Sequence, residues 1–264
     1  MFTMNEQKAI ELGEAGIKAA SERNEYDAIQ NIDYLRELGV ELIKGDLEKE
    51  SKMVAVYIRN IGTKAAQKRF EEPATAAIEA LKELSEMSLE KGYSNALWSL
   101  ARAVQEVGKG AAHFKIEVPA QKAVGVLEII GLGAVEKKME VVTLWTTLAL
   151  EEIDFVSNEQ ELPEIVDAAK AACEAIIKSS EEKGFIARQQ IEVYPKLIYD
   201  TIKNFGGYQD LRPSSYQDQA NEAFREETFF EEEAEDEEAE TEEAETEEAE
   251  TEEAETEEAE NKDK

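Results

Sequence analysis

The sequence repeats a pattern every 23 positions over most of its length, and this period restricts the chain to a stacked architecture. Steps of 23 from Leu38 meet only aliphatic residues, namely Leu38, Ile61, Leu84, Val107, Ile130, Ile153 and Ile176. Nine positions later, a second column holds only large apolar residues, namely Leu47, Phe70, Tyr93, Ile116, Met139, Leu162 and Phe185. A fixed period of about 20–50 residues is typical of repeat proteins, in which each unit buries its apolar face against its neighbours.

Apolar residues inside each period have helical spacing. Leu100, Val104 and Val107 lie at i, i+4 and i+7, which places them on one face of a helix. Helices of about 18 residues with connections of about five residues fill the period. The predicted helices are 5–22, 26–44, 49–68, 74–91, 95–114, 120–137, 141–157, 164–182 and 186–204.

Proline and tryptophan residues recur at twice the basic period. Pro73, Pro119 and Pro163 stand at the expected starts of alternate helices, where the missing N–H of proline has no partner to lose. Trp98 and Trp145 recur at nearly the same interval. The structural unit is therefore predicted to be a pair of helices that spans two periods.

A column of small residues follows the aliphatic one, at Gly39, Gly62, Ser85, Gly108 and Gly131. Glycine inside a helix costs about 1 kcal/mol relative to alanine, so its recurrence favours close crossing of neighbouring helices. The alternative is that some of these glycines mark helix ends. A weaker first copy, Leu12 and Gly13, precedes Leu38 and Gly39 by three positions more than one period, which predicts a three-residue insertion near residues 24–27.

This stack of antiparallel helix pairs resembles the HEAT and armadillo class of α-solenoids, over roughly residues 5–204. The resemblance implies an all-α fold in which residues 1–205 form a right-handed superhelix of about nine helices. Two features depart from the class: the Asp and Arg positions usual in HEAT pairs do not recur, and only alternate copies carry proline. A shared fold of this kind does not transfer a function.

The composition changes after the periodic region, which ends near the glycine pair at 206–207. Residues 206–225 mix turn-forming and aromatic residues and are predicted to be a linker. Residues 226–264 contain the five-residue repeat TEEAE and carry 23 acids against 2 bases, a net charge of −21. Such a segment has too little apolar surface to bury, and it is predicted to be a disordered acidic tail.

The residue types that perform catalysis or bind metals are scarce in this sequence. His113 is the only histidine and lacks the spacing of a metal-binding helix motif; it suits a helix C-terminus. Cys173, the only cysteine, lies in an apolar column of the repeat and is interpreted as a core residue. Acidic groups such as Glu151 and Glu152 are interpreted as parts of solvated faces. We therefore predict no catalytic residue, no cofactor, no metal site and no enzyme activity.

One stripe on the fifth predicted helix is a candidate binding surface. Its members lie at i, i+4, i+7, i+11 and i+15, and they are Trp98, Arg102, Gln105, Lys109 and His113. They form a basic and aromatic ridge opposite the apolar face, and Trp and Arg are frequent interface hot spots. The ridge could hold the acidic group of a peptide. The alternative is an ordinary solvated face with Trp98 packed at its edge.

The net charge limits the kinds of partner that this chain can bind. The chain carries −32 at pH 7, which argues against nucleic acid and membrane surfaces, since both bind through basic patches. No apolar run reaches the ~20 residues of a membrane span. The N-terminus is polar and lacks the apolar core of a signal peptide. These features favour a cytoplasmic protein.

Three functional classes follow from these features. The first is a non-catalytic protein-binding scaffold or adaptor that uses the curved solenoid surface and has a solubilising tail. The alternative is an acidic-tail chaperone, or charge-screening protein, for basic partners. An enzyme is the third class, which the residues do not favour but which the fold alone leaves open.

Overall fold

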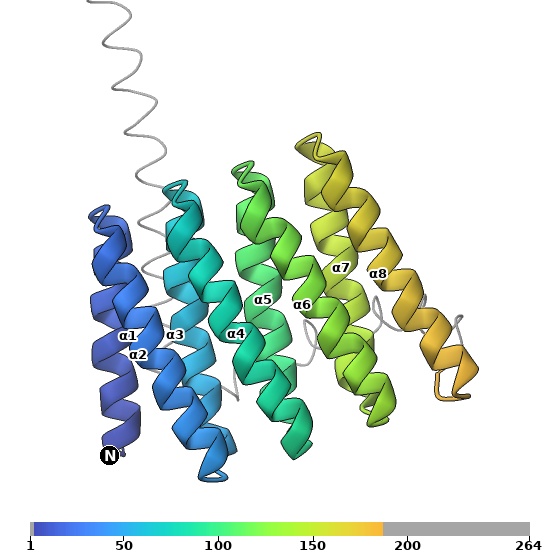
Figure 1. Ribbon diagram of the computed structural model, residues 1–264, viewed down its shortest axis with the longest axis horizontal. Helices are drawn as coiled ribbons and strands as arrows, with labels where there is room; N and C mark the ends of the chain where they lie inside the picture. The colour runs from blue at the N-terminus through green and yellow to red at the C-terminus, as the bar shows by residue number, and fades with distance from the viewer. Residues whose placement is uncertain (1–2, 187–264) are drawn as a thin grey trace, which may run out of the picture. The chain divides into compact units, whose positions relative to one another are not determined.

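The computed structural model describes residues 3–186, and this part of the chain forms eight α-helices without strands (Figure 1). The helices are α1 (Met4–Ser21), α2 (Glu25–Lys44), α3 (Glu48–Gln67), α4 (Glu71–Lys91), α5 (Ser94–His113), α6 (Glu117–Glu136), α7 (Glu140–Glu159) and α8 (Pro163–Glu182). Each lies within a few residues of its predicted bounds. Residues 187–204 of the expected ninth helix, the expected linker and the expected acidic tail lie outside the described residues.

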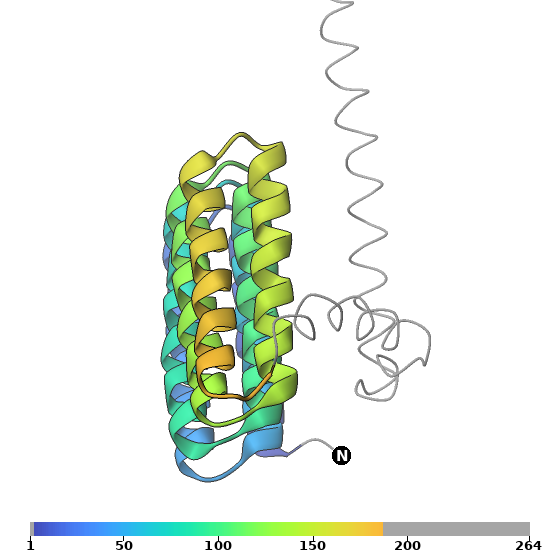
Figure 2. The same cartoon turned by 90° about the vertical axis from the view of Figure 1, so that its right-hand side faces the viewer.

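The helices are arranged in two layers. The odd-numbered helices α1, α3, α5 and α7 pack side by side, and the even-numbered helices α2, α4, α6 and α8 form the second layer (Figures 1 and 2). Each helix packs against its neighbours in sequence and against the helix two along. The prediction of a tandem helical repeat built from helix pairs is therefore confirmed for the described residues.

The joints between helices are shorter than expected because each helix ends in a compact hydrogen-bonded motif. After α2, the N–H of Leu47 donates to the carbonyl of Leu42 at 2.9 Å, and the N–H of Asp46 donates to that of Ile43 at 3.2 Å. This pair of bonds closes a helix around one residue in the left-handed conformation. That residue recurs every 23 positions, with φ between 55° and 77°, at Arg23, Asp46, Arg69, Gly92, Lys115, Lys138, Glu161 and Gly184.

The second apolar column of the sequence is explained by these joints. Each of its residues directly follows the left-handed residue, where an apolar side chain commonly packs back onto the helix that has just ended. Ile116 and Leu162, for example, are 6% and 8% exposed. The same residue precedes the next helix, which leaves room for only two or three connecting residues instead of about five.

The prolines lie slightly deeper in their helices than predicted. Pro163 is the first residue of α8, whereas Pro73 and Pro119 are the third residues of α4 and α6. The first four N–H groups of a helix have no partner within the helix, so proline is tolerated at the third position as well as at the first.

Replacing Lys138 with glycine is expected to raise the free energy of unfolding by about 1 kcal/mol. Lys138 has φ 55°, a left-handed conformation that costs a residue with a Cβ atom about 1–2 kcal/mol, while glycine adopts it freely. Urea denaturation followed by circular dichroism measures the change. Gly92, with φ 77°, provides the reverse control: Gly92→Ala should lower stability. A loss of stability in Lys138→Gly would contradict the prediction.

The column of small residues marks the places where helices in the same layer cross closely. A Cβ atom built on each glycine would come within 2.3–3.1 Å of an aliphatic side chain 45 positions later. The pairs are Gly16 with Ile61, Gly39 with Leu84, Gly62 with Val107, Gly108 with Ile153, and Gly131 with Ile176. The close-crossing interpretation is therefore confirmed, and the aliphatic column is the set of side chains that fill these spaces.

The three-residue insertion predicted near residues 24–27 is absent. Gly16 precedes Gly39 by exactly one period and makes the equivalent crossing, and Arg23 precedes Asp46 by the same interval and has the same left-handed conformation. Gly13, which suggested the insertion, serves another purpose: a Cβ there would stand 1.9 Å from the ring of Tyr57. The period therefore holds from the first helix onward.

Cys173 and helix α6 were both predicted from the sequence to be buried. Cys173 is half-buried and packs against the cluster of Leu144, Ile177 and Ile186, in agreement with its interpretation as a core residue. Among the described helices, α6 alone is long and apolar enough to meet the criteria for a membrane span. Because 56% of its most apolar window is buried in the array, α6 is accounted for as a core helix.

Candidate functional site

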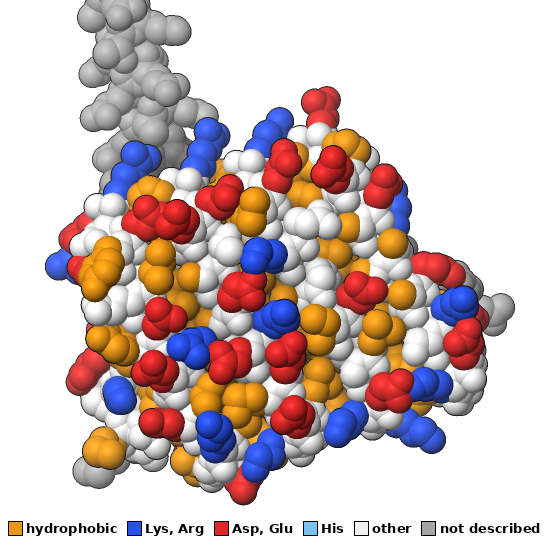
Figure 3. All heavy atoms as spheres, viewed as in Figure 1, with side chains coloured by type: hydrophobic (Ala, Val, Ile, Leu, Met, Phe, Trp, Pro, Cys, Tyr) orange, Lys and Arg blue, Asp and Glu red, His pale blue; other side chains and the backbone are white. Residues whose placement is uncertain are grey.

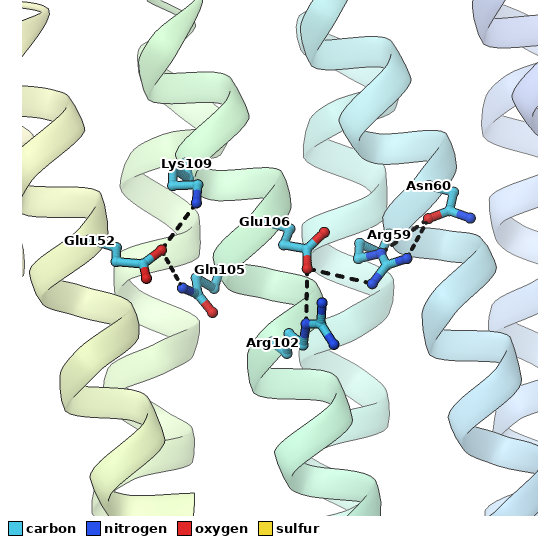
Figure 4. Close-up of polar contacts among 7 residues, drawn as sticks. All are labelled: Arg59, Asn60, Arg102, Gln105, Glu106, Lys109 and Glu152. Carbon is cyan, nitrogen blue, oxygen red and sulfur yellow. Dashed lines mark hydrogen bonds and ion pairs between the residues drawn. The ribbon is translucent and has the colours of Figure 1, made fainter. Parts of the chain in front are cut away.

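The stripe predicted on α5 meets neighbouring helices on both sides (Figure 4). Arg102 donates from Nε to Oε1 of Glu106, one turn later, at 3.0 Å. Arg59, from α3, approaches the same oxygen with a guanidinium nitrogen at 3.5 Å. The carboxylate of Glu106 thus joins both guanidinium groups and ties α3 to α5.

The two arginines are held in place by further contacts and by burial. Arg59 donates from Nε and a terminal nitrogen to Oδ1 of Asn60, at 3.0 and 2.8 Å. The side chains of Arg59 and Arg102 are 16% and 22% exposed. Arginine retains its charge at such positions and presents donors in a fixed planar arrangement. The positive charge here is therefore fixed in position.

The other half of the stripe is tied to α7. The amide of Gln105 donates to Oε2 of Glu152 at 2.7 Å, and Nζ of Lys109 donates to the same oxygen at 3.1 Å. Gln105 is buried, whereas the side chain of Lys109 is 42% exposed. Lys109 therefore keeps access to solvent while Glu152 fixes its position.

The aromatic members of the stripe lie at its two ends. Trp98 packs edge-on against Trp145 of α7, with ring centroids 5.4 Å apart and an interplanar angle of 62°. His113, the last residue of α5, is exposed and packs edge-on against Phe114 at 4.8 Å. Trp98, Gln105 and Lys109 thus contact α7, and Arg102 is linked to α3 through Glu106. His113 lies apart from them at the end of α5.

Sequence reasoning missed the partners of the stripe, Arg59, Glu106 and Glu152. The repeat could have predicted these partners. Residues near two periods apart lie side by side in one layer: Arg59 meets Glu106 and Gln105 meets Glu152, and each pair is 47 positions apart. A comparison of polar residues at this offset would have identified these contacts.

Charge is segregated between the helices. Helix α3 carries four bases against two acids, net +2, and α5 carries two bases against one acid, net +1. Each of the other six described helices has more acids than bases. We call the outward bases of α3 and α5 the basic face, and they are Lys49, Lys52, Arg59, Arg102 and Lys109.

The positions of these bases place them on the outer side of the odd layer. Lys49, Lys52 and Arg59 lie at i, i+3 and i+10, one side of α3. The Arg59–Glu106–Arg102 contacts join this side to that of α5. The even layer differs: viewed from that side, acidic, basic and apolar side chains are interspersed without a large basic cluster (Figure 3).

The basic face borders a surface of opposite character on α7. This helix carries five acids and no base, net −5. It also presents two exposed apolar side chains, Val141 at 58% and Phe155 at 63%. The outer side of the odd layer therefore combines fixed positive charge with exposed apolar groups within the span of three neighbouring helices.

A separate polar cluster links the joint between α2 and α3 to the joint between α4 and α5. Asp46 accepts hydrogen bonds from Nζ of Lys91 at 2.7 Å and from the hydroxyl of Tyr93 at 2.6 Å. These bonds, first that from Lys91 and then that from Tyr93, lower the pKa of Asp46 below its ordinary value. The hydrogen bond to Asp46 raises the pKa of Tyr93 to about 12.

The titration of Tyr93 is expected to occur near pH 12, about two units above that of an ordinary tyrosine. Because the raised pKa belongs to the folded state, the bond stabilises the fold below pH 10, and its contribution disappears as the pH rises through 12. The lowered pKa of Asp46 acts in the opposite range: its contribution is present above about pH 4 and disappears as the pH falls through the folded-state pKa.

The ultraviolet titration curve of the wild type, after subtraction of the curve of the Tyr93→Phe variant, isolates the signal of this tyrosine. In the Asp46→Asn background the acceptor carries no charge, so the same difference should shift toward pH 10. A difference signal already centred at pH 10 in the wild type would contradict the assigned hydrogen bond.

Within residues 3–186, no group of three or more His, Cys, Asp or Glu side chains is arranged to hold a metal ion.

Comparisons with known proteins inform the fold alone. No protein-family model and no curated protein sequence matches the chain. Among solved structures, a chain of the DHF91 filament superposes with a TM-score of 0.53 at 17% identity, covering 66% of this chain and 98% of that one. A chain of the DHF46 filament superposes with a TM-score of 0.53 at 15% identity, covering 67% and 98%. The chain is thus similar in fold to helical-repeat filament subunits.

Proposed function

We propose that this protein is a non-catalytic scaffold or adaptor that binds another protein through the outer side of its odd layer. The observation that carries the proposal is the coincidence of the basic face on α3 and α5 with the exposed apolar side chains of α7. The proposed contact residues are the accessible members of the predicted stripe, Trp98, Arg102, Lys109 and His113, while Gln105 is buried and holds Glu152 in place. A HEAT-like, right-handed superhelix and a cytoplasmic location belong to the same proposal.

The physical support is that positive charge is concentrated on this side of a chain whose net charge is −32. A solvated surface of an acidic protein needs no such concentration, since bases distributed among the acids would lower the electrostatic repulsion more effectively. Trp and Arg side chains that are already fixed in position lose little freedom on binding, which favours their use as contact residues.

A second candidate function rests on a different observation, the net charge of −21 on residues 226–264. A polyacidic segment can bind or screen basic proteins by electrostatic attraction, and such binding weakens steeply as salt is added. A solubilising role for the segment is compatible with either function.

Capture of partners by the full chain distinguishes these functions when surface variants are compared. Lys49→Glu with Lys52→Glu reverses two charges on the basic face. Lys44→Glu with Lys178→Glu makes the same change in net charge on α2 and α8, in the even layer. We expect the first variant to lose its captured proteins and the second to keep them.

A chain that ends at residue 225 completes the comparison. Captured proteins that depend on residues 226–264, are basic and dissociate with salt would favour the acidic-tail function. Equal capture by both surface variants and by the wild type would refute binding through the odd layer.

A further inference from the structure

The outer side of the odd layer carries positive charge at one end and exposed apolar groups at the other. This arrangement limits the chemistry of a partner that can bind there. Along the stack, the outward positions of α3 hold three bases, Lys49, Lys52 and Arg59. Helix α7 has no base and instead presents acids and exposed apolar groups, among them Glu152 and Phe155. The positive end and the apolar end are separated by one helix, α5, whose Arg102 and Lys109 continue the positive charge toward α7.

The two helices of the basic face keep a net positive charge, +2 for α3 and +1 for α5, when all of their own acids are counted. Arg59 and Arg102 meet at the carboxylate of Glu106, which joins the two helices. Glu48, which neighbours Lys49, accepts a hydrogen bond from the backbone N–H of Ala96 at 3.1 Å. These carboxylates of the basic face are thus engaged in tying helices together.

We infer that the partner is a segment rich in Asp and Glu that carries a large apolar residue, and that it lies across α3 and α5 with that residue on α7. This inference rests on the proposed binding function and adds the chemistry of the partner. The carboxylates would approach the basic face, where Lys49, Lys52 and Lys109 supply ammonium groups and the two arginines supply fixed donors. The apolar residue would cover Phe155, which is 63% exposed.

The described helices of a second copy fit the same side poorly. Apart from α3 and α5, all described helices are net negative, so most approaches of another copy bring acidic surfaces together, and like charges oppose association. A nucleic acid would meet the −5 charge of α7 beside the basic face. An acidic peptide with one apolar anchor avoids both conflicts because it needs only a narrow track of positive charge.

The protein contains its own optical reporter for this surface. Trp98 and Trp145 are the only two tryptophans of the chain, and they pack against each other on α5 and α7. A peptide bound between the basic face and Phe155 would alter the surroundings of Trp98, which is partly exposed. Binding at this surface should therefore change tryptophan emission, whereas binding elsewhere leaves the two rings unchanged.

The test uses the full chain and a synthetic peptide of alternating glutamate and alanine with one central phenylalanine. Tryptophan emission and the anisotropy of a labelled peptide are followed together at low ionic strength. We expect saturable binding that changes both signals and weakens as salt is added. Lys49→Glu with Lys52→Glu should raise Kd at least about tenfold, while Lys44→Glu with Lys178→Glu should change it less than about twofold.

The role of the apolar residue is tested with a second pair of measurements. Phe155→Ser should weaken binding of the phenylalanine peptide, yet leave binding of a matched peptide with alanine in that place unchanged. Because Phe155 is 63% exposed, the variant should fold, which its circular dichroism spectrum verifies. Equal effects on both peptides would overturn the placement of the anchor on α7.

Failure of this inference is distinguishable from failure of the proposed function. Absence of saturable binding, equal binding of a peptide with lysine in place of glutamate, or equal losses in both charge-reversal variants would overturn the acidic partner. If the captured proteins still depend on Lys49 and Lys52, the scaffold function stands and the partner has another chemistry. If they do not, both proposals fail.

Discussion

Gly108→Leu is expected to lower the free energy of unfolding by about 3 kcal/mol. A Cβ atom at this position would stand 2.4 Å from the Cβ of Ala123 and 3.1 Å from a methyl group of Ile153. The Cβ of Ala123 is attached directly to the backbone of α6, so it cannot rotate away, and α5 and α6 must move apart. Urea denaturation followed by circular dichroism measures the loss.

Gly125 on α6 provides the matched control, because a Cβ there meets nothing within 4 Å. Gly125→Leu should leave stability unchanged or raise it by up to about 1 kcal/mol, the difference in helix propensity. Gly131→Leu should cost more than about 2 kcal/mol, since the added group meets Ile176 and Thr146. Equal effects of Gly108→Leu and Gly125→Leu would refute the close-crossing role of the glycine column.

Ile130→Ala is expected to lower the free energy of unfolding by about 2–5 kcal/mol, the usual cost of truncating a fully buried aliphatic side chain. Ile130 is 0% exposed and belongs to the aliphatic column that fills the crossings between helices. Its helix, α6, packs against α4, α5, α7 and α8. A cavity there therefore loosens the packing of a helix that is central to the array.

The neighbouring residue supplies the control for this substitution. Ile129 lies on the same helix and is 37% exposed, so Ile129→Ala removes the same atoms from a position that water already reaches. Its effect should stay within about 1 kcal/mol. Thermal and urea denaturation of the two variants measure the difference, and similar losses in both would show that the apolar columns do not mark the core.

The architecture could be predicted from the sequence because every structural position is sampled several times. The aliphatic column that includes Ile130 repeats seven times, and one exception would have been outweighed by the other copies. The position of the first repeat was harder to predict. Leu12 and Gly13 imitate the aliphatic–glycine pair, but Gly13 is small to admit the ring of Tyr57, whereas Gly16 occupies the crossing. Contact with an aromatic ring and close crossing of two helices both require glycine, and the sequence pattern alone could not distinguish these two causes.

The candidate site was predictable only in part, for a related reason. Helical spacing places Trp98, Arg102 and Lys109 on one side of α5 without knowledge of any other helix. Their contacts with Glu152 and Arg59 depend on the offset between stacked helices, which the length of the joints determines. The assumed joint of about five residues was too long, because the apolar residue that ends one helix also begins the next.

The uniform joints also bear on how a chain of this kind can change length during evolution. Because a left-handed residue recurs every 23 positions from Arg23 to Gly184, duplication or loss of a stretch two periods long joins a helix end to a helix start of the same kind. Later helices then keep their direction and their layer. Duplication of a single period would also form a sound joint, but it would transfer each later helix to the other layer. Selection for a surface on one layer, such as the basic face, would therefore retain changes in steps of two periods.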